Sequence, residues 1–333
     1  MWIASEAAIP QSPVEEREVV VPGRLRSNLG RILTGGNRER TLLRRKALYR
    51  GIARFSPLVG VQTSYGLFVV DGRDRGPGES LFAFHEFDDF ETLKLAVSIA
   101  TREGRLAADV STRTFVEVGA NIGSTTVPAL SVIGFGRAQI AEPAPTNLRL
   151  LRANLALNDL TDRVVVMPVG VGASLGTTTL WVGQENHGDH RLWQEQQPGL
   201  QPTRRGVDVT VVTLDSVIGA PTEAGIVWVD TQGFEGFVLV GATNLRDAGV
   251  PFVTEFWPYG MRAAGSWELF VEIVASAAYL VDLGTGECHT SVDRRVLEAL
   301  AAKYDGVLRY TDLLFWFDER VTGAEASGAT ALN

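Results

Sequence analysis

Short apolar runs alternate with helical patterns from residue 114 onward. Thr114–Val118 is rich in β-branched residues and stops at Gly119, and a second short run ends at Glu142. Pro145 stands where a helix would begin, and leucines follow it at helical spacing up to Asn158. Further short runs, each bounded by Gly, Pro or an acidic residue, lie at 164–169, 226–229 and 252–254. Because strands alternate with helices at this spacing, the chain predicts an α/β fold with a doubly wound, mostly parallel sheet.

Two segments interrupt this alternation. Residues 174–213 are Thr-rich and alternate in part between apolar and polar positions, which predicts a β-arm inserted between the third and fourth strands. Tyr279–Leu283 and Leu313–Phe317 are apolar runs near the end of the chain. We expect them to close the sheet as an antiparallel pair.

The first third of the chain has a different pattern. Residues 65–70 and 81–87 look like strands, whereas 90–100 carries apolar positions at helical spacing. We therefore divide the chain into a basic N-terminal extension that is partly disordered or helical (1–55), a cap of strands plus a helix (56–110), a main α/β domain (111–320) and a disordered tail (321–333).

The composition excludes several classes of protein. Apolar residues make up 45% of the 333 residues, enough to bury a sizeable core, so wholesale disorder is excluded. No stretch approaches the ~18 uninterrupted apolar residues that a membrane span requires. The single cysteine, Cys288, excludes an intramolecular disulfide and a cysteine-based zinc site, which favours the reducing cytoplasm. Residues 1–22 lack the basic start and apolar core of a secretory signal.

The charge is unevenly distributed. Residues 24–54 carry ten Lys or Arg against one acid, Glu39, a local charge of +9. Because the net charge of the chain is −8, the remaining residues carry −17. Such a basic arm can bind nucleic acid, anionic lipid or an acidic partner. We favour the simpler interpretation that it folds back on the acidic body or forms a solvated helix. Tyr49 is the only aromatic residue among the basic ones, which does not suggest base stacking, so we do not expect a nucleic-acid partner. A homo-oligomer is left open.

The candidate cofactor loop follows the strand at 114–118. Gly119 and Gly123 allow a tight turn and a close approach to a ligand, and Asn121 tolerates a positive φ best among the other residues. The helix that follows offers free N–H groups to an anion. Glu142, with Pro143 after it, ends the next strand and is placed to accept both hydroxyls of a ribose.

The loop discriminates between nucleotide cofactors. A dinucleotide fingerprint requires G-x-G-x-x-G, but Asn121 and Ser124 replace its second and third glycines. S-adenosylmethionine fits better, because its carboxylate needs only the helix N-terminus and its cationic groups would favour Glu117. A purely structural turn between strand and helix remains the alternative.

Several motifs together resemble the FkbM-type methyltransferase family. These are Glu117–Gly123 with Ala120 inside it, Glu142–Pro145, Thr213–Asp215 and Trp228–Glu235, supported by Glu255–Pro258 and the loop Glu185–Leu192. The likeness runs from about Phe82 to Phe256. It implies a class I, Rossmann-like, S-adenosylmethionine-dependent fold and methyl transfer, usually to a hydroxyl oxygen.

Methyl transfer is an in-line displacement that requires an aligned nucleophile, and an alcohol nucleophile also benefits from a base. Asp230, after the fourth strand, is our first choice for base or for orienting the acceptor; alternatively it holds the cofactor. Glu255 and His190 are the other catalytic candidates. Gln232, Glu235, Asn186 and Trp257 are candidates for acceptor binding. The helix that by resemblance covers the cofactor is preceded by Glu86 and Asp88. The four histidines form no convincing ligand set, so we expect no metal.

The sequence therefore predicts a cytoplasmic S-adenosylmethionine-dependent methyltransferase, directed to a hydroxyl of a sugar or natural product. The enzyme alternative is a nicotinamide-dependent oxidoreductase. The non-enzyme alternative is a nucleoside-binding module that recruits partners through the basic arm. The identity of the acceptor depends on the shape of segments 174–213 and 258–266 and cannot be derived from the motifs.

Overall fold

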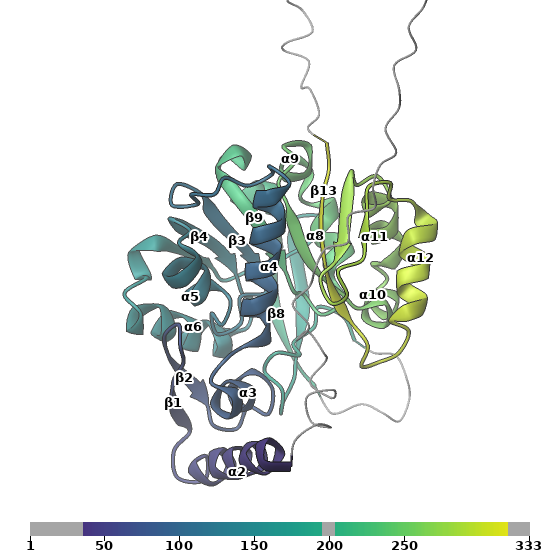
Figure 1. Cartoon of the computed structure of the whole chain (residues 1–333). Helices are drawn as coiled ribbons and strands as arrows, with labels where there is room; N and C mark the ends of the chain where they lie inside the picture. The colour runs from purple at the N-terminus through teal and green to yellow at the C-terminus, as the bar shows by residue number, and fades with distance from the viewer. Residues whose placement is uncertain (1–35, 195–203, 319–333) are drawn as a thin grey trace, which may run out of the picture.

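The structure, a computed structural model, describes residues 36–194 and 204–318. Its centre is an eight-stranded sheet in the order β12-β11-β13-β10-β9-β3-β4-β5 (Figure 1). The strands are β3 (Thr114–Val118), β4 (Arg137–Ala141), β5 (Val164–Met167), β9 (Ala224–Val229), β10 (Phe252–Phe256), β11 (Tyr279–Asp282), β12 (Cys288–His289) and β13 (Thr311–Trp316).

Five neighbouring strands, from β10 to β5, run parallel, and β13 runs antiparallel between β10 and β11. The chain moves from β3 outward to β4 and β5, then returns to the other side of β3 with β9. This reversal makes the sheet doubly wound, as predicted. Val118 pairs with both Ala141 and Val229, so the three strands that meet at the reversal end at the same level. Ligands bind at this edge in open α/β sheets.

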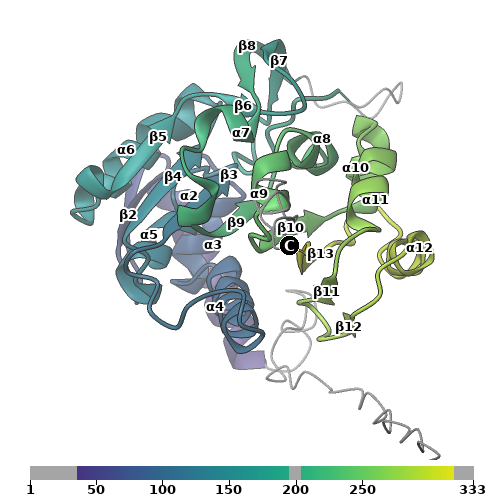
Figure 2. The same cartoon turned by 90° about the horizontal axis from the view of Figure 1, so that it is seen from above.

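Helices cover both faces of the sheet (Figure 2). One face carries α4 (Asp88–Arg102), α5 (Thr126–Pro128), the π-helical turn η1 (Ala129–Ile133) and α6 (Pro145–Leu157). The other carries α7 (Leu214–Val217), α8 (Glu235–Val240), α9 (Thr243–Asp247), α10 (Pro258–Ala264), α11 (Trp267–Val274) and α12 (Arg294–Lys303). Two hydrophobic cores result, one on each face. The short 3₁₀ turns η2 (Thr161–Arg163) and η3 (Pro221–Glu223) precede β5 and β9.

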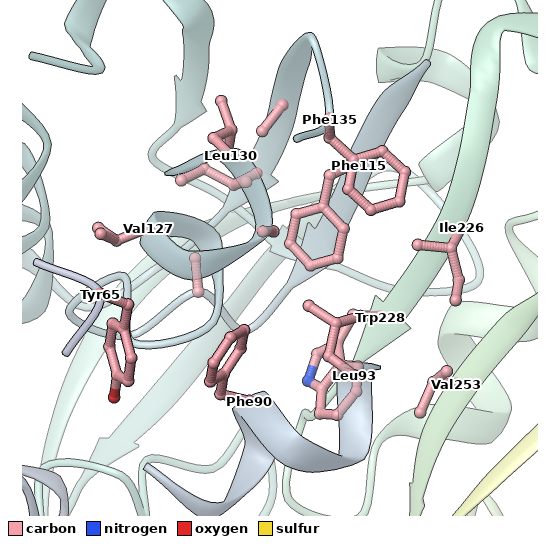
Figure 3. Close-up of a cluster of buried hydrophobic side chains, with 14 of the residues drawn as sticks. Tyr65, Phe90, Leu93, Phe115, Val127, Leu130, Phe135, Ile226, Trp228 and Val253 are labelled. Carbon is pink, nitrogen blue, oxygen red and sulfur yellow. The ribbon is translucent and has the colours of Figure 1, made fainter. Parts of the chain in front are cut away.

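The core under α4 shows why these strands are uninterrupted apolar runs. Phe115 of β3 and Phe135 are fully buried with ring centroids 5.6 Å apart, and Leu93 of α4 and Trp228 of β9 complete the cluster (Figure 3). A strand that is covered on both faces must be apolar on both. Truncating such a buried aromatic side chain costs about 3–5 kcal/mol.

The hairpin of β1 (Leu58–Gln62) and β2 (Leu67–Asp71) docks on α6 through two asparagines. The Asn154 side-chain oxygen accepts the Val69 N–H at 2.7 Å, and its amide donates to the Ile122 carbonyl at 2.9 Å. Asn158 makes a matching pair of bonds with Leu67. The predicted strand at 65–70 is therefore confirmed, and the hairpin shares the core of the main sheet.

The strand predicted at 81–87 is wrong, because these residues largely belong to helix α3 (Pro77–Phe84). Asp74 accepts the N–H groups of Gly76 and Gly78 at the start of this helix. Its far side is covered by α2 (Gly36–Ile52), where Tyr49 packs against Phe82. A helix that is covered on two sides loses the polar face by which its period is recognised.

The described part of the basic arm folds back on the body. Arg50 of α2 donates to Glu79 at 2.7 Å, Lys46 lies 3.6 Å from the same carboxylate, and Arg45 donates to the Ala83 carbonyl. This confirms the simpler interpretation for residues 36–54. The predicted disorder at 1–35 and in the tail lies outside the described residues. Among those that are described, no helix combines the length and apolar character needed to cross a membrane.

The inserted β-arm is confirmed between β5 and β9. Strands β7 (Gly176–Val182) and β8 (Arg205–Val212) pair antiparallel, and the two-residue strand β6 (Gly170–Val171) joins β8. Trp181 also bridges to Arg191, which ties the following loop to the arm. Residues 195–203 of the predicted arm lie outside the described residues.

Candidate active site

The loop after β3 is held by contacts that only glycine permits. Gly119 has φ +92°, and a Cβ there would lie 1.8 Å from the carbonyl oxygen of Asp230. Gly123 has φ +86° and Asn121 φ +50°, as the sequence predicted. The ends of β3 and β9 therefore approach so closely that the glycine loop lies directly against the backbone of Asp230.

The helix after this loop is shorter than expected. Helix α5 has three residues and continues into the π-helical turn η1. Its first residue, Thr126, donates its hydroxyl hydrogen to Glu117 inside the protein. Ser124 and Thr125, just before this helix, line the cavity, and the anion site expected at the helix N-terminus stays a prediction.

Glu142 organises the loop from the end of β4. Its two carboxylate oxygens accept the N–H groups of Asn121 and Ala144, both at 2.8 Å. Burial raises the pKa of Glu142 to about 7. Each carboxylate oxygen has a second lone pair, so Glu142 keeps acceptor capacity toward the cavity that it lines.

Glu117 lies at the end of β3 and is 2% exposed. Burial raises its pKa to about 8, partly offset by the hydrogen bond from Thr126. Its carboxyl group lines the same cavity as Glu142. A ligand that carries positive charge would stabilise its ionised form.

The loop at 185–192 closes over the glycine loop. The amides of Asn121 and Asn147 both donate to the His187 carbonyl, at 3.4 and 3.1 Å. The His187 N–H donates to Asp74, which also caps α3. Asn186 accepts the Gly188 N–H through its side chain. Segments that are distant in sequence thus form one wall of the cavity.

Asp230 and Glu255 are joined by one amide. Gln232 donates through Nε2 to Asp230 at 2.7 Å and to Glu255 at 3.1 Å. Burial raises the pKa of both carboxyls, and the negative charge of Asp230 raises that of Glu255 further. The structure thus brings together three residues that the sequence predicted for the acceptor end.

Glu235 begins α8 and holds the preceding loop. One oxygen accepts the Thr231 N–H and hydroxyl and the Gly233 N–H, at 2.9, 3.0 and 3.2 Å. Its other oxygen is buried without a hydrogen-bond partner among the described residues. Glu235 does not line the cavity, unlike the other predicted acceptor residues.

His190 lines the cavity but is a weak base. Its Nδ1 accepts the Gly183 N–H at 3.1 Å, and burial lowers its pKa to about 4. The neighbouring His187 ring, 6.0 Å away, contributes in the same direction. His190 is therefore neutral at pH 7.

A stack of aromatic rings and a guanidinium forms the wall next to Gln232. The Arg191 guanidinium carbon lies 4.7 Å from the Trp193 ring and 4.9 Å from the Trp257 ring. Trp193 donates its indole N–H to the Gln232 carbonyl at 2.7 Å. Arg191 also pairs with Asp189 at 2.6 Å. The stack fixes the predicted acceptor residues Gln232 and Trp257 relative to each other.

These residues surround one cavity of about 420 Å³, within the range of small-molecule sites. It extends from the glycine loop to the ends of β9 and β10. Eleven of the predicted site residues line it: Glu117, Gly119, Asn121, Glu142, Pro143, Asn186, His190, Asp230, Gln232, Glu255 and Trp257. Ala120 and Gly123 shape the loop behind it instead.

Sequence reasoning missed acidic residues near the ends of β9 and β10, where they line the cavity. Asp312 of β13 pairs directly opposite Glu255, and burial raises its pKa to about 7. Asp89 of α4 lines the cavity too, whereas Glu86 is exposed; the side chain of Asp88 lies outside the described residues. No local motif marks Asp312, because only the antiparallel pairing places it beside Glu255.

The comparisons with known proteins agree with this geometry. The family model of the methyltransferase FkbM domain matches residues 117–275, which include the glycine loop, Glu142, Asp230 and Glu255. Residues 117–275 form a methyltransferase FkbM domain. The sheet order and this match confirm the predicted class I methyltransferase fold. No curated protein matches the sequence.

Three solved structures illustrate the likeness. The methyltransferase FkbM from Methylobacillus flagellatus KT is 16% identical, with 83% of this chain and 60% of that chain covered at a TM-score of 0.40. The O-methyltransferase from Bacillus cereus is 12% identical, with 72% and 94% covered at 0.33. A geranyl diphosphate methyltransferase is 14% identical, with 78% and 99% covered at 0.38. The chain thus spans 60% of the length of the first of these.

Proposed function

We propose that this FkbM domain protein transfers a methyl group from S-adenosylmethionine to a hydroxyl oxygen of a sugar or natural-product acceptor. One observation carries the proposal. Glu142 and the glycine loop line one end of the cavity, and Asp230 and Glu255 line the other end. Donor and acceptor would therefore meet in one shared cavity.

The residues present fit S-adenosylmethionine. The side-chain oxygens of Asn121 and Asn147 are buried beside the cavity without a hydrogen-bond partner among the described residues. They, together with Glu142, would accept hydrogen bonds from the ribose hydroxyls and the amino groups of the cofactor. Glu117 would lie near its cationic methionine end. The cofactor supplies an activated methyl group bound to a sulfonium.

The acceptor end supplies orientation and a base. Asp230 is held by Gln232, and a carboxyl whose pKa is raised by burial is a stronger base than an exposed one. We assign to Asp230 the acceptance of the hydroxyl proton, or the orientation of that hydroxyl, and to Glu255 and Trp257 contacts with the acceptor. His190 is a poor alternative base because it is protonated only near pH 4.

The test is a transfer assay with isotope-labelled S-adenosylmethionine and a panel of hydroxylated acceptors. Asp230→Asn keeps the side-chain shape but removes proton acceptance. We expect turnover to fall by ~10²–10⁴, while the affinity for S-adenosylhomocysteine changes less than about tenfold. Asp162→Asn, in η2 and outside the cavity, is the matched control and should leave both unchanged.

Two results would contradict the proposal. Failure to bind S-adenosylhomocysteine would remove the cofactor assignment. Binding without transfer to any hydroxyl, nitrogen or carbon acceptor would support a nucleoside-binding module instead. If Asp230→Asn loses cofactor affinity together with turnover, Asp230 is a cofactor ligand, and Glu255 becomes the candidate base.

A further inference from the structure

Three carboxylates that the sequence places far apart meet behind the acceptor end of the cavity. One oxygen each from Asp230, Glu235 and Glu255 lie within 4.8 Å of one another. They come from the end of β9, the start of α8 and the end of β10. Such a cluster is costly in a protein interior unless protons or cations compensate the charge.

The charges around this cluster do not relieve it. The groups that act most strongly on Glu255 are the carboxyls of Asp230, Glu235, Asp312 and Asp89, all of the same sign. Asp312 lies directly across the β10–β13 pair from Glu255, a position where like charges destabilise a sheet. Gln232 donates to Asp230 and Glu255 but carries no charge.

Glu235 supplies an independent sign of a missing partner. Its side chain is 0% exposed, so water cannot solvate it from the surface. While one oxygen accepts three hydrogen bonds, the other is buried and has no partner among the described residues. A buried carboxylate oxygen without a partner is expensive, and the helix start and the loop prevent it from turning to solvent.

We propose that Asp230, Glu235 and Glu255 bind a hard divalent cation of the Mg²⁺, Mn²⁺ or Ca²⁺ class. Carboxylate oxygens are the preferred ligands of these ions. The three oxygens lie within 4.8 Å of one another. Since two oxygens on opposite sides of one Ca²⁺ are ~4.6–5.2 Å apart, all three can reach a single ion of that size. This departs from our expectation of a site without metal.

The proposal also defines a role relative to the acceptor. Asp230 and Glu255 line the cavity, whereas Glu235 lies behind it, so a cation held by all three would face the acceptor space. There it would orient an acceptor hydroxyl and lower its pKa. Only this consequence rests on the proposed methyl transfer; the binding of the cation does not.

Manganese is the probe for the test. Full-length protein is stripped with a chelator, and Mn²⁺ is titrated while electron paramagnetic resonance measures the free ion. We expect one saturable site per chain that Ca²⁺ or Mg²⁺ displaces. Glu255→Gln and Glu235→Gln should each weaken Mn²⁺ binding at least tenfold. Glu268→Gln is the matched control: Glu268 is exposed on α11, paired with Arg294, and the variant should bind like the wild type.

A second measurement keeps the result interpretable if Glu235→Gln folds poorly. Ca²⁺ should raise the melting temperature of the wild type and of Glu268→Gln, because it binds only the folded state, but not that of Glu255→Gln. No Mn²⁺ binding by the wild type, or equal binding by the folded Glu255→Gln variant, would overturn the proposal. Neither the Mn²⁺ titration nor the melting experiment contains S-adenosylmethionine or an acceptor. Cation binding without methyl transfer would therefore contradict only the proposed function.

Discussion

Replacing Gly119 with alanine tests whether β3 and β9 are locked together at the cavity. Two costs apply. The φ of +92° is unfavourable for any residue with a Cβ, by ~1–2 kcal/mol. In addition, the new Cβ would lie 1.8 Å from the Asp230 carbonyl oxygen and must reach at least 3.0 Å, so the strand ends must separate by at least 1.2 Å.

The second cost can be worked out from the bonds at this position. The Asp230 N–H donates to the Val118 carbonyl at 3.0 Å, and the Gly119 N–H donates to the Ala141 carbonyl at 2.9 Å. A shift of this size weakens both, at ~0.5–1.5 kcal/mol each, and strains the buried packing around them by ~1–3 kcal/mol. We therefore expect Gly119→Ala to cost roughly 3–8 kcal/mol of the free energy of unfolding.

Gly134 provides a matched control. Its φ is +96°, almost the same as that of Gly119, but a Cβ there meets nothing within 4 Å. Gly134→Ala should therefore cost only the conformational term, ~1–2 kcal/mol. Urea unfolding measures both costs, and titration with S-adenosylhomocysteine measures binding. We expect at least tenfold weaker binding for Gly119→Ala and none of this loss for Gly134→Ala. Equal costs for the two variants would refute the idea of a locked strand pair.

The remaining predictions concern buried polar groups. Glu142→Ala should weaken S-adenosylhomocysteine binding by roughly 10- to 150-fold. It should also lower the free energy of unfolding by ~2–5 kcal/mol, because two buried N–H groups lose their acceptor. If only stability falls, Glu142 has a purely structural role. The affinity for the cofactor should rise between pH 6 and 8. Glu117 is protonated below its pKa of about 8 and must lose that proton to pair with a cation. Calorimetry measures this affinity, and an unchanged value would remove Glu117 from the cofactor site. Without ligand, stability should fall over the same pH range, because the raised folded pKa favours the native state only while Glu117 is protonated. Asn154→Leu should cost ~2–5 kcal/mol in urea unfolding, since Val69 and Ile122 lose their partners; a cost below about 1 kcal/mol would mean that the hairpin does not depend on Asn154.

The sequence by itself determined the sheet and the end of the candidate site that is formed by the glycine loop. Parallel strands that are buried on both faces must be short apolar runs. Turns with positive φ favour Gly and Asn, so Gly119, Asn121 and Gly123 could be placed from their local pattern. Glu142 and Asp230 could be placed for the same reason, because each directly follows a recognisable strand. These features depend on neighbours that are close along the chain.

Tertiary structure alone decided the rest. The helix at Pro77–Phe84 is apolar on two sides because α2 covers it, which disguised its period as that of a strand. Asp312 reaches Glu255 only through antiparallel pairing across 57 positions of sequence. One Glu235 oxygen binds the 231–233 loop, and the other is buried without a partner among the described residues. Charge repulsion, burial and ligand spacing at a site depend on distances in space, and a sequence pattern contains only distances along the chain.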